Sequence, residues 1–206
     1  MPPAFASDPE TAAYYDQRAH EYDDWYTGQG LFATRSRPGW AEEVARIVEM
    51  VQGLAPARTL DVACGTAFLT RHLRGFVVGL DQSPEMVRIA QSRLPDGLAL
   101  VGDALSLPVA EASFDRLFTG HFYGHLAPEE RARFLAEARR VAGELVVVDT
   151  ARRDDTPAER WEDRVLGDGS RHRVYKRFLS PQQLVEELGG ETLFAGRWFV
   201  SGRVRF

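Results

Sequence analysis

The sequence predicts an α/β domain built on a mostly parallel β-sheet with helices on both faces, a doubly wound sheet. Short apolar segments alternate with amphipathic segments of helical spacing through the middle of the chain, and such alternation produces parallel strands joined by right-handed crossovers. The length of 206 residues allows one ordinary domain and is too short for two full enzyme domains. A hydrophobic content of 44% and a charged content of 27% are typical of a globular protein.

Five segments have the length and apolar content of strands that are buried on both faces of a sheet. These segments are residues 58–63, 76–80, 98–101, 114–119 and 144–148.

Helical segments separate several of these strands. Apolar residues recur at helical spacing in residues 41–52. Ser83 followed by Pro84 is typical of a helix start, and Pro128 followed by two glutamates indicates another. We therefore expect a core of alternating strands and helices over residues 41–150.

The N-terminal segment differs from this core. Residues 9–24 are rich in tyrosine and acidic residues, and we expect a helix there that lies across the carboxyl edge of the sheet. Residues 25–40 contain glycine and proline and are expected to form a loop. Residues 1–40 are thus a candidate lid.

The C-terminal segment, residues 151–206, is expected to form a wall on the substrate side of the same single domain. Asp168-Gly169 lies between residues 163–167 and 170–178, which have the pattern of an antiparallel hairpin. A short helix should follow Ser180-Pro181, and one or two final strands should complete the chain.

Composition argues against several classes of protein. The 25 basic and 30 acidic residues give a net charge of −5, which disfavours nucleic acid as a partner. A single cysteine cannot form an internal disulfide, which fits a cytoplasmic location. We expect no membrane association, because the sequence shows neither a secretory signal nor a run of ~18 apolar residues. No histidine or cysteine spacing indicates a metal site.

The first strand runs into a turn over residues 61–68, at the edge where open α/β sheets bind ligands. Ala63, Gly65 and Ala67 have small side chains, so a ligand can approach the backbone closely. We expect a helix to follow this turn and to present free amide groups at its N-terminus.

Three consecutive predicted strands each end in a carboxylate, at Asp61, Asp81 and Asp103. Buried unpaired charge is costly, so packing alone does not explain this register. An acid about twenty positions after the first strand accepts hydrogen bonds from ribose hydroxyls in this topology. The dinucleotide fingerprint is incomplete, because Phe68 stands at its third glycine position. The pattern therefore predicts a nucleoside without a charged linker.

These residues resemble the class I S-adenosylmethionine-dependent methyltransferases of the small-molecule type. The resemblance covers roughly residues 12–150 and is carried by the segments YYDQRAHEYD (14–23), LDVACGT (60–66), GLDQSPEM (79–86), GDA (102–104) and FD (114–115). It implies a seven-stranded Rossmann-like sheet and S-adenosyl-L-methionine as the cofactor.

The resemblance also implies roles for residues at the methionine end of the cofactor. The turn formed by Ala63, Cys64 and Gly65 would hold the methionine part, and Asp61 would orient this loop and the amino group. Cys64 is expected to be a small buried thiol and not a nucleophile. The chain departs from the family at Ala67, where glycine is usual.

The resemblance assigns the nucleoside end to residues that follow the second and third strands. Asp81 would accept hydrogen bonds from both ribose hydroxyls. Gln82 and Met86 would flank the adenine, and Asp103 with the amide of Ala104 would bind the adenine edge.

Methyl transfer is an in-line displacement that depends chiefly on alignment and exclusion of water. An acceptor that must lose a proton also needs a nearby base. His121 lies at the end of the fourth predicted strand and is our candidate base or acceptor-binding residue. For His125 we favour a structural role.

Residues of the two ends add further candidates. Tyr14 and neighbouring aromatic residues either enclose the sulfonium by cation–π contact or form the core face of a helix. Arg37, or alternatively Arg18, would meet the methionine carboxylate. The predicted hairpin carries a basic cluster that either binds an acidic substrate or is a solvated face, namely Arg171, His172, Arg173, Lys176 and Arg177.

We therefore expect metal-independent methylation of an oxygen or nitrogen atom of a small metabolite, by a monomer or homodimer. Residues 119–122, Thr-Gly-His-Phe, do not resemble the Asn-Pro-Pro-Tyr run of enzymes that methylate base amines. Two alternatives remain open: a nicotinamide-dependent oxidoreductase on the same topology, and a non-catalytic nucleoside-binding protein without an acceptor pocket.

Overall fold

The computed structural model describes residues 5–6 and 8–206, and it contains a large sheet and a small one. The large sheet has seven strands in the order β3-β2-β1-β4-β5-β9-β8. Its strands are β1 (Thr59–Val62), β2 (Val77–Asp81), β3 (Leu98–Val101), β4 (Phe114–Gly120), β5 (Ala142–Thr150), β8 (Glu191–Ala195) and β9 (Phe199–Arg205). The first five strands are parallel, whereas β9 pairs antiparallel with both β5 and β8. The predicted seven-stranded, mostly parallel sheet is confirmed.

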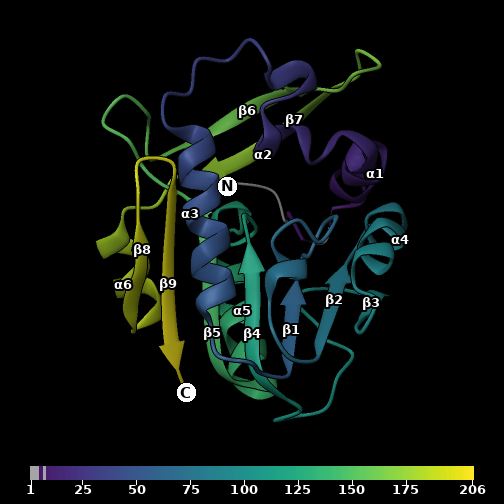
Figure 1. Cartoon of the computed structure of the whole chain (residues 1–206), viewed down its shortest axis with the longest axis vertical. Helices are drawn as coiled ribbons and strands as arrows, with labels where there is room; N and C mark the ends of the chain where they lie inside the picture. The colour runs from purple at the N-terminus through teal and green to yellow at the C-terminus, as the bar shows by residue number, and fades with distance from the viewer. Residues whose placement is uncertain (1–4, 7) are drawn as a thin grey trace.

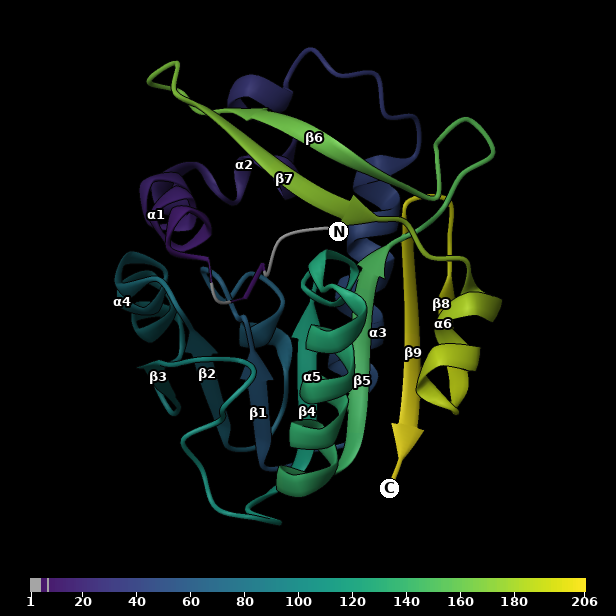
Figure 2. The same ribbon diagram turned by 180° about the vertical axis from the view of Figure 1, so that it is seen from behind.

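Helices cover both faces of this sheet. Side chains alternate between the two faces of a strand, so Val146 of β5 packs with α3 (Trp40–Gly53), whereas Val147 packs with α5 (Pro128–Val141). The helix α4 (Pro84–Arg93) packs on β2 and β3, and α6 (Pro181–Leu188) packs on β8 and β9. In Figure 1, α3 stands in front of the sheet, and Figure 2 brings α5 to the front.

The predicted helix starts are confirmed at two serines. The side chain of Ser83 accepts a hydrogen bond from the Met86 amide at 3.1 Å, and Ser180 accepts one from the Gln183 amide at the same distance. Gly189 ends α6 in the left-handed conformation, with φ of 72°. Such caps satisfy amide and carbonyl groups that a helix end leaves unpaired.

The N-terminal segment folds as several short elements and not as the single helix expected over residues 9–24. Helix α1 (Pro9–Arg18) is followed by a 3-10 turn (Ala19–Glu21) and by α2 (Asp24–Thr27). Gly28 ends α2 with a positive φ, which glycine adopts without steric cost. The expected loop over residues 25–40 thus begins with the end of α2.

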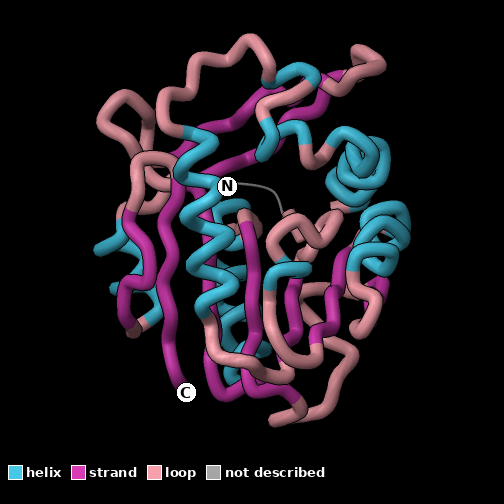
Figure 3. Tube along the Cα trace, in the orientation of Figure 1, coloured by secondary structure: helices cyan, strands magenta, loops and turns pink. Residues whose placement is uncertain are grey.

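The predicted hairpin is confirmed as a separate two-stranded sheet, β6 (Glu159–Val165) and β7 (Arg171–Arg177). Its first strand begins earlier than expected. The arrowheads of the parallel strands point toward this hairpin and toward α1 and α2 (Figure 1). Figure 3 shows the small sheet lying across the carboxyl edge of the large one. The helices α1 and α2 and the hairpin therefore cover the edge where ligands were expected.

The helix expected after the first strand is absent, and this expectation was wrong. The 14 residues between Val62 and Val77 contain only a 3-10 turn, η3 (Thr70–His72). Ala63, Gly65 and Ala67 have φ values of 59°, 55° and 62°, which a right-handed helix does not permit. A ligand at this loop therefore meets loop amides and not a helix N-terminus.

Within the described part of the chain, no helix is both long and apolar enough to cross a membrane.

Candidate active site

Three adjoining cavities lie at the carboxyl edge of the large sheet. The edge cavity, of about 520 Å³, is lined by Phe5, Ala6, Tyr15, Tyr22, Ala63, Gly65, Leu80, Asp81, Gln82, Gly102, Ala104, Gly120, His121, Phe122 and His125. The loop cavity, of about 250 Å³, is lined by Tyr22, Tyr26, Asp61, Ala63, Cys64, Phe68, Leu69, Thr70, Phe118 and Gly120. The cationic cavity, of about 520 Å³, is lined by Tyr15, Arg18, Tyr22, Trp25, His121, His125, Thr150, Glu162, Arg164, Lys176 and Phe178.

Asp81 is the buried carboxylate of the edge cavity. It stands at the end of β2, where Oδ2 accepts a hydrogen bond from the Gly65 amide at 2.9 Å and Oδ1 accepts one from the Ser83 amide at 3.0 Å. Burial raises the pKa of Asp81, and these backbone hydrogen bonds act against that rise. Asp81 therefore ties the first loop to the start of α4.

The structure places five of the cofactor-binding candidates in the wall of the edge cavity. They come from the ends of three neighbouring strands, which the parallel topology brings together. These residues are Ala63, Gly65, Asp81, Gln82 and Ala104.

Two expected adenine-binding residues lie outside the walls of the three cavities. Met86 is completely buried at the start of α4. The Asp103 carboxylate accepts a hydrogen bond from the Leu105 amide at 2.8 Å, whereas its neighbours Gly102 and Ala104 line the edge cavity. Asp103 thus shapes the turn beside the cavity, and the three strand-end acids do not share one cavity wall.

Arg37 and Tyr14 do not line these cavities. Arg37 donates a hydrogen bond to the Trp25 carbonyl at 2.8 Å, and its guanidinium lies 3.8 Å from the Trp40 ring centroid. Tyr14 is buried, and its hydroxyl accepts a hydrogen bond from Arg18 at 3.1 Å.

Two other tyrosines occupy the place expected for Tyr14. Tyr15 and Tyr22 line both the edge cavity and the cationic cavity. Tyr15 belongs to α1, whereas Tyr22 follows the 3-10 turn Ala19–Glu21. Because the two residues lie on different elements, helical spacing in the sequence does not select them among the tyrosines of the segment.

Asp61 belongs to the loop cavity. Its Oδ2 accepts a hydrogen bond from the Thr70 hydroxyl at 2.6 Å, and its buried Oδ1 has no partner among the described residues. Burial raises the pKa of Asp61 to about 8. Cys64 lies in the same cavity, and burial also raises the pKa of its thiol, so the thiolate is disfavoured there. A buried polar atom without a partner is what a ligand group would satisfy.

Phe68 leaves the edge cavity open. Its ring stacks on Tyr26 with the ring centroids 3.9 Å apart, at the wall of the loop cavity. Ala67 is completely buried and adopts the left-handed conformation. Glycine is usual at this position in the family that the sequence resembles.

His121 lies between the edge cavity and the cationic cavity. It follows β4 with φ of 60°, and its ring is 4.7 Å from the Trp25 ring between centroids. Both ring nitrogens are buried without a partner in the described chain, and burial lowers the pKa of His121 to about 3. The imidazole is therefore neutral at pH 7 and is a weak base.

His125 is engaged elsewhere. Its Nδ1 lies 2.6 Å from the Tyr175 carbonyl oxygen, and its ring stacks on Phe5 at 4.5 Å between centroids. These contacts fit the structural role expected for His125, although its ring also lines the edge and cationic cavities.

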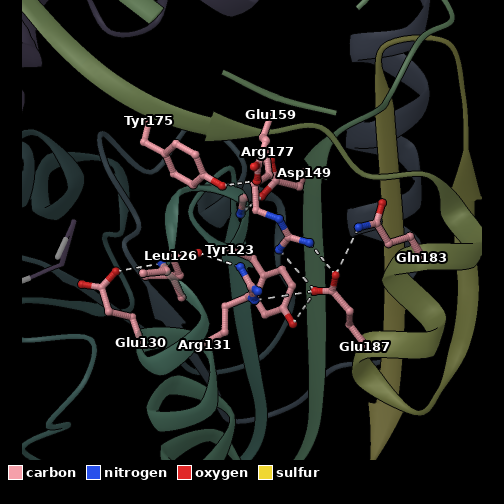
Figure 4. A network of polar contacts seen from close by, with 12 residues as sticks. Tyr123, Leu126, Glu130, Arg131, Asp149, Glu159, Tyr175, Arg177, Gln183 and Glu187 are labelled. Carbon is pink, nitrogen blue, oxygen red and sulfur yellow. Dashed lines mark hydrogen bonds and ion pairs between the residues drawn. The ribbon is translucent and has the colours of Figure 1, made fainter. Parts of the chain in front are cut away.

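The basic cluster of the hairpin separates into residues with different environments. Lys176 is buried in the cationic cavity and pairs with Asp149 at 2.6 Å. Arg177 pairs with Glu187 of α6 at 2.5 Å, and the Tyr123 hydroxyl donates to Glu187 at 3.1 Å. Figure 4 shows this network, which fastens the hairpin to the core. Arg171 and Arg173 are exposed.

The described residues contain no group of three or more histidine, cysteine, aspartate or glutamate side chains that could hold a metal ion.

Known proteins that are similar to this chain are named methyltransferases. Residues 60–144 match the family described as "Methyltransferase domain". A demethylmenaquinone methyltransferase of Thermotoga maritima is 38% identical over 112 residues, which are 50% of this chain and about half, 48%, of that protein. An uncharacterized methyltransferase of Alkaliphilus oremlandii is 29% identical over 86% of this chain and 79% of its own length.

Solved structures match over nearly the whole chain. The DhpI-SAM-HEP complex is 25% identical, covers 94% of this chain and 95% of that chain, and has a TM-score of 0.72. The DhpI-SAH complex is 26% identical, covers 94% of both chains, and has a TM-score of 0.70.

Proposed function

The chain belongs to the class I S-adenosylmethionine-dependent methyltransferases, and we propose that it methylates an oxygen or nitrogen atom of a small metabolite without a metal ion. This membership removes the nicotinamide-dependent oxidoreductase as an alternative. The observation that carries the proposal is that the edge cavity and the cationic cavity share four wall residues, Tyr15, Tyr22, His121 and His125. A cofactor cavity that adjoins a second cavity across shared wall residues is what group transfer to a small molecule requires.

The residues present fit S-adenosylmethionine. The unpartnered Oδ1 of Asp61 offers an acceptor for the amino group, and a Cβ at Gly65 would lie 3.2 Å from the Tyr22 ring, so glycine leaves space at this loop. We assign the methionine part to the loop cavity, with Ala63 and Cys64, and the nucleoside part to the edge cavity.

The nucleoside assignment gives each residue of the edge cavity a role. The Asp81 carboxylate would accept hydrogen bonds from the ribose hydroxyls, and Gln82 and the backbone at Ala104 would meet the adenine. When bound, the cofactor supplies an electrophilic methyl group on a sulfonium sulfur. Tyr15 and Tyr22 would then exclude water from the boundary between the two cavities.

His121 would act by orienting the acceptor more than by accepting a proton from it. A conjugate acid pKa of about 3 is far from the operating pH at which a general base is effective. Its neutral ring nitrogens face no other partner in the described chain, so they are free to hydrogen-bond an acceptor. We therefore assign His121 to acceptor orientation.

The cofactor site is tested by calorimetry with S-adenosylhomocysteine. Wild-type protein should bind it, and Asp81→Ala should abolish binding because the ribose would lose its carboxylate partner. Ala104→Leu should weaken binding independently by filling the edge cavity. The matched control is Asp96→Ala, at an exposed acid remote from the three cavity walls. Unchanged affinity in both site variants would contradict the assignment.

Catalysis is tested by incubating the enzyme with a cell extract and an isotopically labelled methyl donor. Mass spectrometry should find at least one small molecule that gains the labelled methyl group. Tight cofactor binding without any labelled product would favour the non-catalytic nucleoside-binding alternative.

A further inference from the structure

The cationic cavity gathers three basic side chains beside the proposed transfer point. Arg18 comes from α1, whereas Arg164 and Lys176 come from β6 and β7. In the antiparallel register, Arg164 stands opposite His172 and Lys176 stands opposite Arg160, so both basic residues project from the same face of the hairpin. The lid helix and the hairpin thus present positive charge to one space.

Arg18 is the unusual member of this set. It is 6% exposed, and its one hydrogen bond among the described residues is to the Tyr14 hydroxyl at 3.1 Å. Its guanidinium lies 4.9 Å from the Tyr22 ring centroid. None of the ion pairs in the described chain involves Arg18. A buried cation without an anion is costly and calls for one.

The other two cations are paired but retain spare donors. Arg164 pairs with Glu162 at 2.5 Å. Lys176 donates to Asp149 at 2.6 Å and contacts the His121 carbonyl oxygen at 3.5 Å. A guanidinium has five N–H donors and an ammonium has three, so these contacts leave donors available at both residues.

The charges at this cavity do not balance. The three cations face two carboxylates, Asp149 and Glu162, and Glu162 also pairs with Arg160 at 2.8 Å, so at least one positive charge is in excess. His121 and His125 add none, because burial lowers the pKa of both rings. The excess charge would be neutralised by one anionic ligand group.

We propose that the methyl acceptor carries an oxyanion, of the carboxylate or phosphate type, and that Arg18, Arg164 and Lys176 bind this group. The inference rests on the proposed function, because the cavity is assigned to the acceptor through the walls it shares with the cofactor site. Arginine forks and ammonium groups are the donors that bind carboxylate and phosphate oxygens. The aromatic walls at Trp25 and Phe178 would contact the uncharged part of the acceptor.

The first test measures binding of inorganic phosphate, sulfate and acetate to the protein saturated with S-adenosylhomocysteine. Calorimetry and thermal unfolding are run with chloride added to equal ionic strength. At least one of the three anions should bind and raise the melting temperature. Stronger binding of phosphate or sulfate would indicate a tetrahedral oxyanion, and stronger binding of acetate would indicate a carboxylate.

Variants locate the site. Arg18→Gln should weaken anion binding by about tenfold or more, the effect of losing a charge-assisted contact, and Arg164→Gln should do the same. Arg18→Lys should restore part of the affinity. The matched control is Arg171→Gln, which removes one exposed positive charge from the same hairpin. Lys176 is left unchanged, because its loss would strand the buried Asp149.

Arg18→Gln should fold as well as wild type, because no carboxylate of the described chain depends on Arg18. It should also bind S-adenosylhomocysteine as wild type does. Loss of cofactor affinity with retained anion binding would instead place Arg18 on the methionine carboxylate and overturn the inference. So would the failure of all three anions to bind the cofactor-loaded protein. If S-adenosylhomocysteine itself does not bind, the proposed function fails and not this inference alone.

Discussion

At the scale of single residues, the candidate site is marked by polar groups that the fold leaves unsatisfied. Five buried side-chain polar atoms of the described chain have no partner, and three of them belong to Asp61 and His121. Buried polar atoms are otherwise almost always paired in proteins. The concentration of such atoms at the carboxyl edge of one sheet therefore indicates where ligand groups complete the hydrogen bonding.

Proton release on binding of S-adenosylhomocysteine tests the role of Asp61. Its pKa of about 8 means that the carboxyl is mostly protonated at pH 6.5, and the cationic amino group of S-adenosylhomocysteine would favour the ionised form. Binding at pH 6.5 should therefore release close to one proton. The release should decline as pH rises through 8. Calorimetry in buffers of different ionisation enthalpy measures the proton count.

The control for this prediction is Asp61→Asn, which has no proton to release. If that variant binds S-adenosylhomocysteine too weakly to measure, the pH dependence of the wild-type affinity tests the same prediction. This affinity should rise by up to about tenfold per pH unit below pH 8 and level off above it. Equal proton release by wild type and variant would show that another group titrates on binding.

More of the strand-end candidates than of the candidates in residues 1–40 lie in the cavity walls. Asp81 and Gln82 stand at the end of the buried strand β2, and Ala104 follows β3, an exposed edge strand and not the buried strand expected, so their places depend on the parallel topology. Tyr14 and Arg37 depend on the phase of a short helix and on the path of a loop. A shift of one position turns Tyr14 into the core and Tyr15 toward the cavities.

At the scale of elements, predictions succeeded where side chains act on their own backbone. Ser83 and Ser180 begin helices by accepting hydrogen bonds from amides of the first turn. The missing helix after β1 had no such signal. Alanine rarely adopts positive φ, so Ala63 and Ala67 conceal two left-handed positions that glycine would have revealed.

Glu43 connects α3 to the turn between β8 and β9. This buried carboxylate of α3 accepts hydrogen bonds from the amides of Arg197, Trp198 and Phe199, at 3.0, 2.6 and 2.8 Å. Glu43→Ala leaves these donors unpaired and should lower the free energy of unfolding by about 3 kcal/mol. Urea denaturation measures this change.

The neighbouring Glu42 provides the matched control, because it is an exposed glutamate on the same helix. Glu42→Ala should change the free energy of unfolding by less than about 0.5 kcal/mol, as surface substitutions usually do. Equal effects of the two substitutions would contradict the anchoring role of Glu43.

At the scale of the whole molecule, the cationic cavity joins parts of the chain that are far apart in sequence. Arg18 belongs to α1, His121 follows β4, and Lys176 belongs to β7. Figures 1 and 2 show α1, α2 and the hairpin at the same edge of the large sheet. No local sequence pattern relates these residues. The sequence alone therefore could not show whether the basic cluster of the hairpin binds a substrate or is a solvated face.

This arrangement predicts a two-step change in amide hydrogen exchange. S-adenosylhomocysteine should slow exchange in residues 14–26 and in loops 63–67 and 81–86, because these segments line or flank the edge and loop cavities. Subsequent addition of phosphate should extend protection to β6 and β7, because the anion would join Arg18 to Arg164 and Lys176. Exchange is followed by mass spectrometry at times short relative to global unfolding.

Helix α6 and strand β8 serve as internal controls, since none of their residues lines the three cavities. A ligand that only stabilised the native state would slow the slowest exchange throughout the molecule, whereas ordering of the lid slows fast exchange in the lid alone. Equal protection of α6 and residues 14–26 at short times would therefore contradict closure over the cofactor. Protection of the hairpin by phosphate in Arg18→Gln, to the same extent as in wild type, would show that the anion binds outside the cationic cavity.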